Sequence, residues 1–339
     1  QGNQDAQYKV GMYYENGIVV VQNLKKAICW YKKSAKQGNF EAQYKLGFFY
    51  ECGQNLEKDV NKAIFWYMKS AKKGYMEAQY RLALCYANQD PLEKNLKEAA
   101  SLYLKAANQG HMLSQYKLGC AYKDGDLGIK KNFQQAVFWF DKAACQGYFK
   151  AQYRLGFCYM NNIGVDKDPI RGAILYHESA NNGFAEAQFA LADCYKNGFG
   201  VSKNLETALY WVRLAANQSH TEAMSKLGFY YEQGIGTEKD LETACLWYSR
   251  AALNGHVGAK SVLFHRFELT QYSLSKEKTR KEKQKGKERE IRDICDIDPQ
   301  AESDNLSEAD IDINETNKVD DHANIDRSFP RRAPSPCSL

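Results

Sequence analysis

The feature that most constrains the fold of this chain is a short sequence motif that recurs at a fixed interval. Residues 41–50 read EAQYKLGFFY, and residues 77–86 read EAQYRLALCY. With the alanine of AQY as position zero, the register falls on Ala6, Ala42, Ala78, Ser114, Ala151, Ala187, Ala223 and Ala259, at steps of 36 residues with one step of 37. A catalytic motif is usually written once, whereas such a period is typical of solenoids and other repeat arrays. The repeated motif therefore indicates the type of fold rather than a catalytic site.

The first segment of each unit has the pattern of an amphipathic helix. Apolar residues stand at positions zero, four and eight, as in Ala42, Leu46 and Tyr50, and this spacing is one face of a helix. Position five is Gly or Ala in all seven full units, at residues 11, 47, 83, 119, 156, 192 and 228. Glycine inside a helix costs up to about 1 kcal/mol relative to alanine. Its regular use predicts that two helices approach closely at this position.

The second segment of each unit follows a loop such as NGFGVSKN and is also helical in pattern, as in AIFWYMKSA and AVFWFDKAA. All five tryptophans (residues 30, 66, 139, 211 and 247) share one position, which Leu102 and Leu175 fill in the other two units. A position that accepts Trp or Leu is expected to be core rather than a stacking site for a ligand. The segment closes on glycine in every full unit except at Ser219, which fits a left-handed C-cap.

These units predict an all-α fold, a right-handed α-solenoid of about seven helix-turn-helix repeats of 36 residues plus a closing helix in GAKSVLFHRF. The pattern A-x-x-x-L-G-x-x-Y, then G-x-G-V-x-x-D, then A-x-x-W-Y-x-x-A-A-x-x-G resembles the Sel-one-like repeats, relatives of the tetratricopeptide repeat. The resemblance covers residues 1 to about 267. It implies that the first helices line a concave face.

The periodicity stops after Phe267, so we expect a repeat array at 1–267 and a separate tail at 268–339. Residues 276–292 are dominated by Lys and Arg, whereas residues 293–326 are rich in Asp and Glu and contain no aromatic residue. Such a composition cannot bury enough apolar surface to offset the entropy of ordering, so the tail is expected to be disordered. Cys337 lies one residue short of the C-a-a-X prenylation arrangement.

Charge and cysteine usage argue against several classes of protein. The formal net charge of +5 is small for 339 residues and is evenly spread over the array, so we expect no nucleic-acid partner. The chain contains no run of eighteen or more apolar residues, so no transmembrane helix is predicted and we expect no membrane association. The cysteines occur singly at positions that also accept Tyr, Phe or Ala, which is typical of small core residues in the reducing cytoplasm. Three N-x-[ST] sequons keep a lumenal location open.

No pattern in the chain points to catalysis or to a cofactor. There is no G-x-S-x-G elbow, no phosphate-binding glycine loop, no H-E-x-x-H and no C-x-x-C pair for zinc. His111, His220 and His256 follow the residue that closes a repeat, where other units have Asn, Tyr or Phe, so they are expected to be turn or packing residues. We expect a protein that is not an enzyme and that holds no cofactor or metal.

The candidate site is the outward side of the first helices. On a helical wheel, positions two, three, six and nine lie opposite the packing positions. The residues there that are predicted to bind a partner protein or peptide are Tyr8, Tyr44, Phe48, Tyr80, Arg81, Tyr116, Tyr153, Arg154, Phe157 and Phe229. An aromatic stripe flanked by cations suits an extended peptide with acidic residues. The same aromatic residues could instead pack against the neighbouring repeat, and substitution of Phe48 and Phe157 by Ala separates these interpretations.

The sequence favours a non-enzymatic scaffold or adaptor that binds its partner on the concave face. Proteins that it resembles serve in signalling, in cell-wall synthesis or in endoplasmic-reticulum quality control. Two alternatives stay open: a regulatory repeat arm of a larger signalling protein, for example one linked to a kinase, and an activator of a cell-wall synthase. The first is suggested by residues 1–3, which align with residues 37–39 at the close of a repeat. We therefore expect the natural protein to extend further toward its N-terminus.

Overall fold

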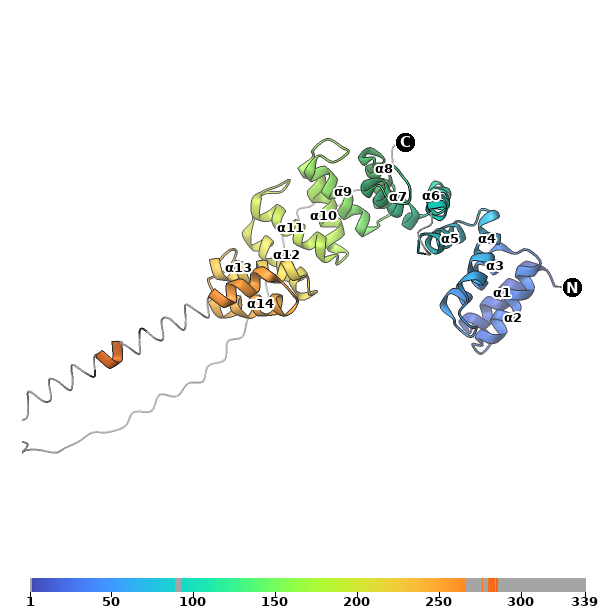
Figure 1. Cartoon of the computed structure of the whole chain (residues 1–339), viewed down its shortest axis with the longest axis horizontal. Helices are drawn as coiled ribbons and strands as arrows, with labels where there is room; N and C mark the ends of the chain where they lie inside the picture. Colours follow the sequence, from blue (N-terminus) through green and yellow to red (C-terminus); the bar gives the residue numbers. More distant parts are fainter. Residues whose placement is uncertain (1, 89–92, 266–275, 277–279, 284, 286–339) are drawn as a thin grey trace, which may run out of the picture. The chain divides into compact units, whose positions relative to one another are not determined.

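The computed structural model describes residues 2–88 and 93–265, together with residues 276, 280–283 and 285 (Figure 1). Its helices are α1 (Gln4–Asn16), α2 (Leu24–Lys36), α3 (Phe40–Cys52), α4 (Val60–Lys72), α5 (Met76–Asn88), α6 (Glu93–Asn108), α7 (Met112–Asp124), α8 (Phe133–Cys145), α9 (Phe149–Asn161), α10 (Pro169–Asn181), α11 (Ala185–Asn197), α12 (Leu205–Asn217), α13 (Thr221–Gln233) and α14 (Leu241–Leu253). Residues 257–265 are also helical, as expected for a closing helix. No strand occurs among these described residues, and the all-α prediction is confirmed.

Each repeat is one helical hairpin, with an odd-numbered first helix and an even-numbered second helix, from repeat 1 (α1 and α2) to repeat 7 (α13 and α14). The chain forms two compact units, one of residues 1–215 and one that begins at Ala216. In the first unit, every helix from α1 to α10 packs against the next helix along the chain, as Figure 1 shows for α1 to α4. In the second unit α13 packs against α14. The tail expected at 268–339 lies almost wholly outside the described residues.

Capping residues fix the ends of both helices in a repeat, as repeat 2 illustrates. The side chain of Asn39 accepts a hydrogen bond from the backbone N–H of Ala42 at 2.7 Å, and Asp59 does the same for Lys62 at 2.9 Å. Between them Gly53 ends α3 in the left-handed region, with φ of 72°. Because each cap satisfies backbone groups that a helix end leaves without partners, the hairpin begins and ends at defined residues.

The three histidines that close repeats are helix caps as well. The Nδ1 atoms of His111, His220 and His256 accept hydrogen bonds from the backbone N–H groups three residues further on, at 3.2, 3.2 and 2.9 Å. They stand where Asn39 stands in repeat 2. The prediction of a turn or packing role is therefore confirmed. At His111, where burial lowers the pKa of the ring, an acceptor at Nδ1 fits a neutral ring with its proton on Nε2.

The glycines of position five lie where the two helices of one hairpin touch. A Cβ atom placed on Gly47 would come within 2.6 Å of the ring of Tyr67, and one on Gly119 within 2.5 Å of the ring of Phe140. These rings belong to the second helix of the same repeat and are fully buried. The prediction of close helix approach at position five is confirmed.

The position that carries tryptophan is part of the core, as predicted. Trp139, Trp211 and Trp247 are 6%, 7% and 9% exposed, and Trp30 and Trp66 are partly buried. Trp66 packs against a cluster of buried residues from α2, in the preceding repeat, and from α3, in its own repeat. Tryptophan therefore links one hairpin to the hairpin before it.

The cysteines that share one position of the repeat are core residues too. Cys85, Cys158 and Cys194 are buried, and burial raises the pKa of their thiols to about 11, about 11 and about 12. The eight cysteines of the described residues are free thiols. A thiol with a raised pKa is a poor nucleophile at neutral pH, so these three side chains serve packing.

Candidate protein-interaction surface

The structure places the predicted site residues on the odd-numbered helices. Nine of the ten belong to the first unit, and Phe229 belongs to the second. The tyrosines of position two and the residues Phe48, Arg81 and Arg154 are partly buried, whereas Phe157 and Phe229 are 41% and 40% exposed. The ten residues therefore differ in how much of each side chain a partner could reach.

The tyrosines of position two pack between repeats. The ring of Tyr44 lies 5.8 Å from that of Tyr67 in its own repeat and 5.3 Å from that of Tyr75, where the next repeat begins. Tyr80, Tyr116 and Tyr153 make ring contacts of the same kind, and the ring of Tyr8 contacts that of Tyr31 in its own repeat. Burial raises the pKa of Tyr8 and of Tyr116 to about 12. These rings stabilise the stack, and only part of each side chain faces outward.

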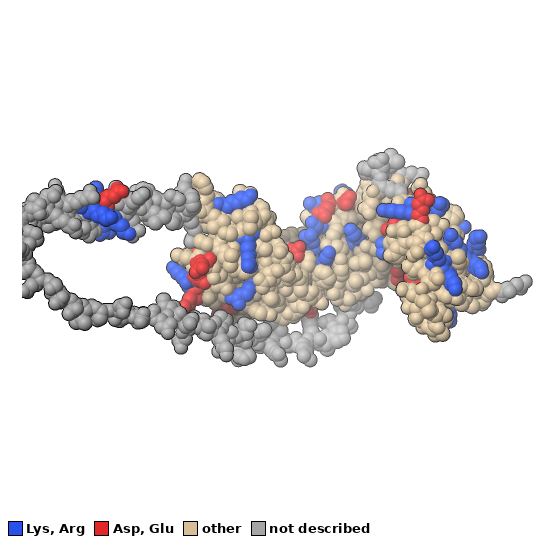
Figure 2. Space-filling model, turned by 90° about the horizontal axis from the view of Figure 1, so that it is seen from below, with Lys and Arg blue, Asp and Glu red and all other residues tan. Residues whose placement is uncertain are grey.

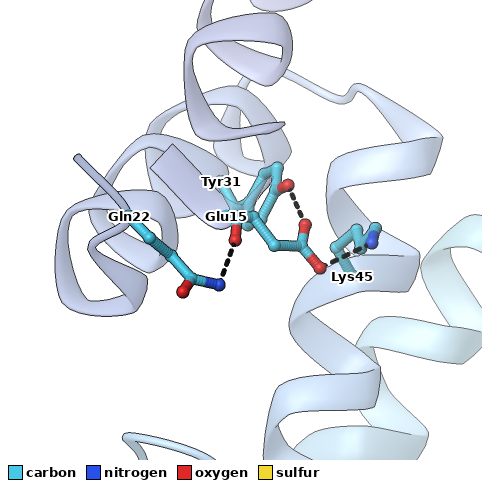
Figure 3. A network of polar contacts seen from close by, with 4 residues as sticks. All are labelled: Glu15, Gln22, Tyr31 and Lys45. Carbon is cyan, nitrogen blue, oxygen red and sulfur yellow. Dashed lines mark hydrogen bonds and ion pairs between the residues drawn. The ribbon is translucent and has the colours of Figure 1, made fainter. Parts of the chain in front are cut away.

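A polar network on the outward side links repeat 1 to repeat 2 (Figure 3). The hydroxyl of Tyr31 donates a hydrogen bond to the carboxylate of Glu15, whose other oxygen lies 2.8 Å from Nζ of Lys45. Gln22 donates to the backbone carbonyl of Glu15 at 2.9 Å. Burial first, and then the bond to Glu15, raise the pKa of Tyr31, so the hydroxyl stays protonated and keeps donating. Glu15 thus joins the second helix of its own hairpin to the first helix of the next.

Repeat 2 uses the same arrangement one period later. The hydroxyl of Tyr67 donates to Glu51 at 2.5 Å, and a guanidinium nitrogen of Arg81 lies 3.7 Å from the same carboxylate. The guanidinium carbon of Arg81 also lies 5.4 Å from the ring centroid of Phe48. Arg81 and Phe48, two of the predicted site residues, are thus brought together, and each contacts the other within the array.

The carboxylate of position nine was not among the predicted site residues. Its signal in the sequence was present, because Glu15, Glu51 and Glu232 share one register position and each accepts from a tyrosine on the second helix of its repeat. A helical wheel shows that position nine faces outward, but it does not show which residue of the next hairpin it meets.

Arg154 is held differently from Arg81. Its guanidinium carbon lies 5.8 Å from the ring centroid of Tyr153, and the group is within hydrogen-bonding reach of the Tyr116 hydroxyl. Phe157 lies one helical turn further along α9 on the same side. Arg154 and Phe157 therefore lie about one turn apart on the outward side of one helix.

Charged side chains, possible metal ligands and long apolar helices bear on which kinds of site the described residues can form. On the face drawn in Figure 2, Lys and Arg side chains are spread over several helices. Within the part of the chain that the structure describes, no group of three His, Cys, Asp or Glu residues could hold a metal ion. No described helix is long and apolar enough to cross a membrane.

Comparison with known proteins gives a family and two close folds. A model of the Sel1 repeat matches seven segments, at residues 4–39, 40–75, 77–111, 113–148, 149–184, 185–220 and 221–256. The crystal structure of c5321, a protective antigen of uropathogenic Escherichia coli strains displaying an SLR fold, is 31% identical, with a TM-score of 0.73 over 78% of this chain and 56% of that chain. This chain thus spans little more than half of that protein. No curated protein matches the sequence.

A second solved structure supports the same assignment. The Sel1 repeat protein from Oxalobacter formigenes is 31% identical, with a TM-score of 0.62, and the match covers 78% of this chain and 76% of that chain. The seven segments found by the family model coincide with the seven hairpins of the structure.

Proposed function

Because the chain belongs to the Sel1 repeat family, whose members are generally non-catalytic protein-interaction scaffolds, we propose that it is an adaptor that holds a partner protein or peptide. The partner binds the outward side of the odd-numbered helices, which corresponds to the concave face in the family. We further propose that the adaptor serves signalling in the cytoplasm, where its single thiols stay reduced. The tail at 268–339 is proposed to be a segment separate from this binding face.

The exposed ring of Phe157 is the observation that supports this proposal most. In repeat 2 the ring of Phe48 is covered by Arg81, which stands at position three of the next repeat. The residue that follows Phe157 in the same way is Ala190, which is too short to cover the ring. Phe157 is 41% exposed about one helical turn from Arg154, and aromatic residues and arginine are both enriched in protein interfaces.

Alanine substitution at the two phenylalanines separates binding from packing. We expect Phe157→Ala to lose most of the captured partner in affinity purification of the full chain, while the melting temperature changes little, because an exposed ring contributes little to the core. We expect Phe48→Ala to lower the melting temperature more, since its ring contacts Phe49 and Arg81. The proposal fails if Phe157→Ala retains its partners or unfolds the array.

A further inference from the structure

The internal carboxylates of repeats 1 and 2 are missing from the middle of the first unit. Position nine is glutamate in repeats 1 and 2, but it is Ala87 in repeat 3 and Lys123 in repeat 4. In the first two repeats this glutamate binds the cation at position three of the next repeat. The equivalent cations further along are Lys117 and Arg154. In the preceding repeats, position nine is an alanine and a lysine, whereas for Lys45 and Arg81 it is an acid.

Two cations of this region, Arg154 and Lys117, accordingly lack an acidic partner within the described part of the chain. Among the residues that the structure describes, neither Arg154 nor Lys117 forms an ion pair. Lys123 pairs at 2.7 Å with its neighbour Asp124, whose side chain is 56% exposed. The guanidinium of Arg154 is half-buried between aromatic groups, so salt screens it less than it screens an exposed side chain. This combination favours an anion that comes from outside the array.

We propose that Lys117, Lys123 and Arg154, with the exposed ring of Phe157, form a subsite that binds an acidic peptide segment of a partner protein. This inference rests on the proposed function and names the chemistry of the partner at one part of the binding face. The planar guanidinium of Arg154 can donate two parallel hydrogen bonds to a carboxylate, and the two lysines add charge around it. An apolar side chain next to the acid in the peptide lies against Phe157.

Peptide carboxylates fit this subsite better than a nucleic-acid backbone does. Binding to nucleic acid usually uses many Lys and Arg contacts along a continuous basic track. The subsite has three cations within two repeats, and no two of them are adjacent in the sequence. Arg154 lies over the ring of Tyr153, and Lys123 pairs with Asp124. A short segment with alternating acidic and apolar residues matches both parts of the subsite.

The decisive variant restores the internal acid of the first repeats. Lys123→Glu places at position nine of repeat 4 the residue that binds Arg81 in repeat 2, so Arg154 becomes neutralised from within. The full chain is titrated with a fluorescein-labelled peptide of sequence GDLDLDG and with its counterpart GNLNLNG, and anisotropy is measured. We expect GDLDLDG to bind the unmodified chain at least about tenfold more tightly than GNLNLNG does, since hydrogen bonds to charged groups are the stronger ones.

Two further variants make the result specific. Lys123→Glu and Arg154→Gln are each expected to weaken binding of GDLDLDG about tenfold, with melting temperatures close to that of the unmodified chain. Lys150→Glu is the matched control, because it makes the same charge change as Lys123→Glu at an exposed residue of α9 whose amine lies near Phe149. It is expected to change the affinity by about twofold or less, as a screened surface charge does.

Several outcomes would overturn the subsite. These are equal binding of the two peptides, equal losses in Lys123→Glu and Lys150→Glu, or tighter binding of an oligouridine than of GDLDLDG. If any of these occurs while Phe157→Ala still loses the captured partner, the subsite is wrong and the scaffold function stands. If Phe157→Ala also keeps its partner, both proposals fail.

Discussion

At the scale of single residues, the repeat separates side chains that pack from side chains that face outward. In EAQYKLGFFY, Ala42, Leu46 and Phe49 are at most 1% exposed, and Gly47 admits the ring of Tyr67. Gln43 is buried as well and donates a hydrogen bond to the carbonyl of Ala35, near the end of the preceding helix, at 3.1 Å. The repeated glutamine therefore ties one hairpin to the next.

One residue departs from the repeat in a way that predicts a gain in stability. Ser219 closes repeat 6 with φ of 65°, where the other full repeats close on glycine with φ between 81° and 104°. A residue with a Cβ atom is strained there. We expect Ser219→Gly to raise the free energy of unfolding by about 0.5–1 kcal/mol in urea titrations, since the strain relieved exceeds the added entropy of the unfolded chain.

The opposite change supplies the control for Ser219. Gly255 closes repeat 7 at φ of 92° in the same unit. Gly255→Ala is expected to lower the free energy of unfolding by about 1 kcal/mol. The interpretation is wrong if Ser219→Gly is destabilising or if Gly255→Ala has no effect.

Residue patterns predicted the packing positions well, but they could not rank the outward ones. Burial at positions zero, four and five follows from helical periodicity, which one sequence contains. The exposure of Phe157 depends instead on Ala190, and the cover on Phe48 depends on Arg81, each in the next hairpin of the chain. A helical wheel shows one helix and gives no contact with the next hairpin, so the sequence did not distinguish Phe48 from Phe157.

At the scale of the helix, caps decide where each element begins, and one cap is sensitive to pH. His111 caps α7 through Nδ1, and burial lowers the pKa of its ring. The unfolded chain therefore takes up a proton at a higher pH than the folded chain does. Stability is complete above the unfolded pKa of about 6.5 and falls as the pH drops below it.

Asparagine at this cap is expected to remove that pH dependence. In the variant His111→Asn the cap resembles Asn39 and does not titrate, so the difference in unfolding free energy between neutral and mildly acidic pH becomes smaller. Burial lowers the pKa of His177 in the same direction, and the variant should retain that residue's share. Urea titrations at a series of pH values measure both. An unchanged pH profile in the variant would contradict the role of His111.

Hairpin boundaries were predictable because caps are local, whereas the links between hairpins were not. Gly53 marks the end of α3, and Asp59 marks the start of α4. The Tyr31–Glu15–Lys45 network joins three helices from two repeats. Its members recur at one period, but recurrence alone does not distinguish a contact from a shared surface position.

At the scale of the whole molecule, repetition allows each hairpin to keep the same packing residues while its outward residues vary. Position nine changes from Glu51 in repeat 2 to Lys123 in repeat 4, and position three is Arg154 in repeat 5 but Ala190 in repeat 6. Stability in such arrays is the sum of each repeat's own stability and its contacts with its neighbours, so substitutions outside those contacts are tolerated. We therefore expect the repeated residues to set stability and the variable residues to set partner choice.

The division between packing residues and partner-binding residues is tested most directly by comparing two pairs of one basic and one aromatic residue on neighbouring helices. Arg154 and Phe157 lie about one turn apart on the outward side of α9. Phe138 and Lys142 lie about one turn apart on α8, with a ring that is 47% exposed and an amine 5.6 Å from its centroid. Partners are captured with the full chain and quantified by mass spectrometry for the double variants Arg154→Gln/Phe157→Ala and Lys142→Gln/Phe138→Ala. This division predicts that the α9 variant loses its partner and the α8 variant keeps it, with both melting close to the unmodified chain. Equal loss from both variants, or loss from the α8 variant alone, would contradict it.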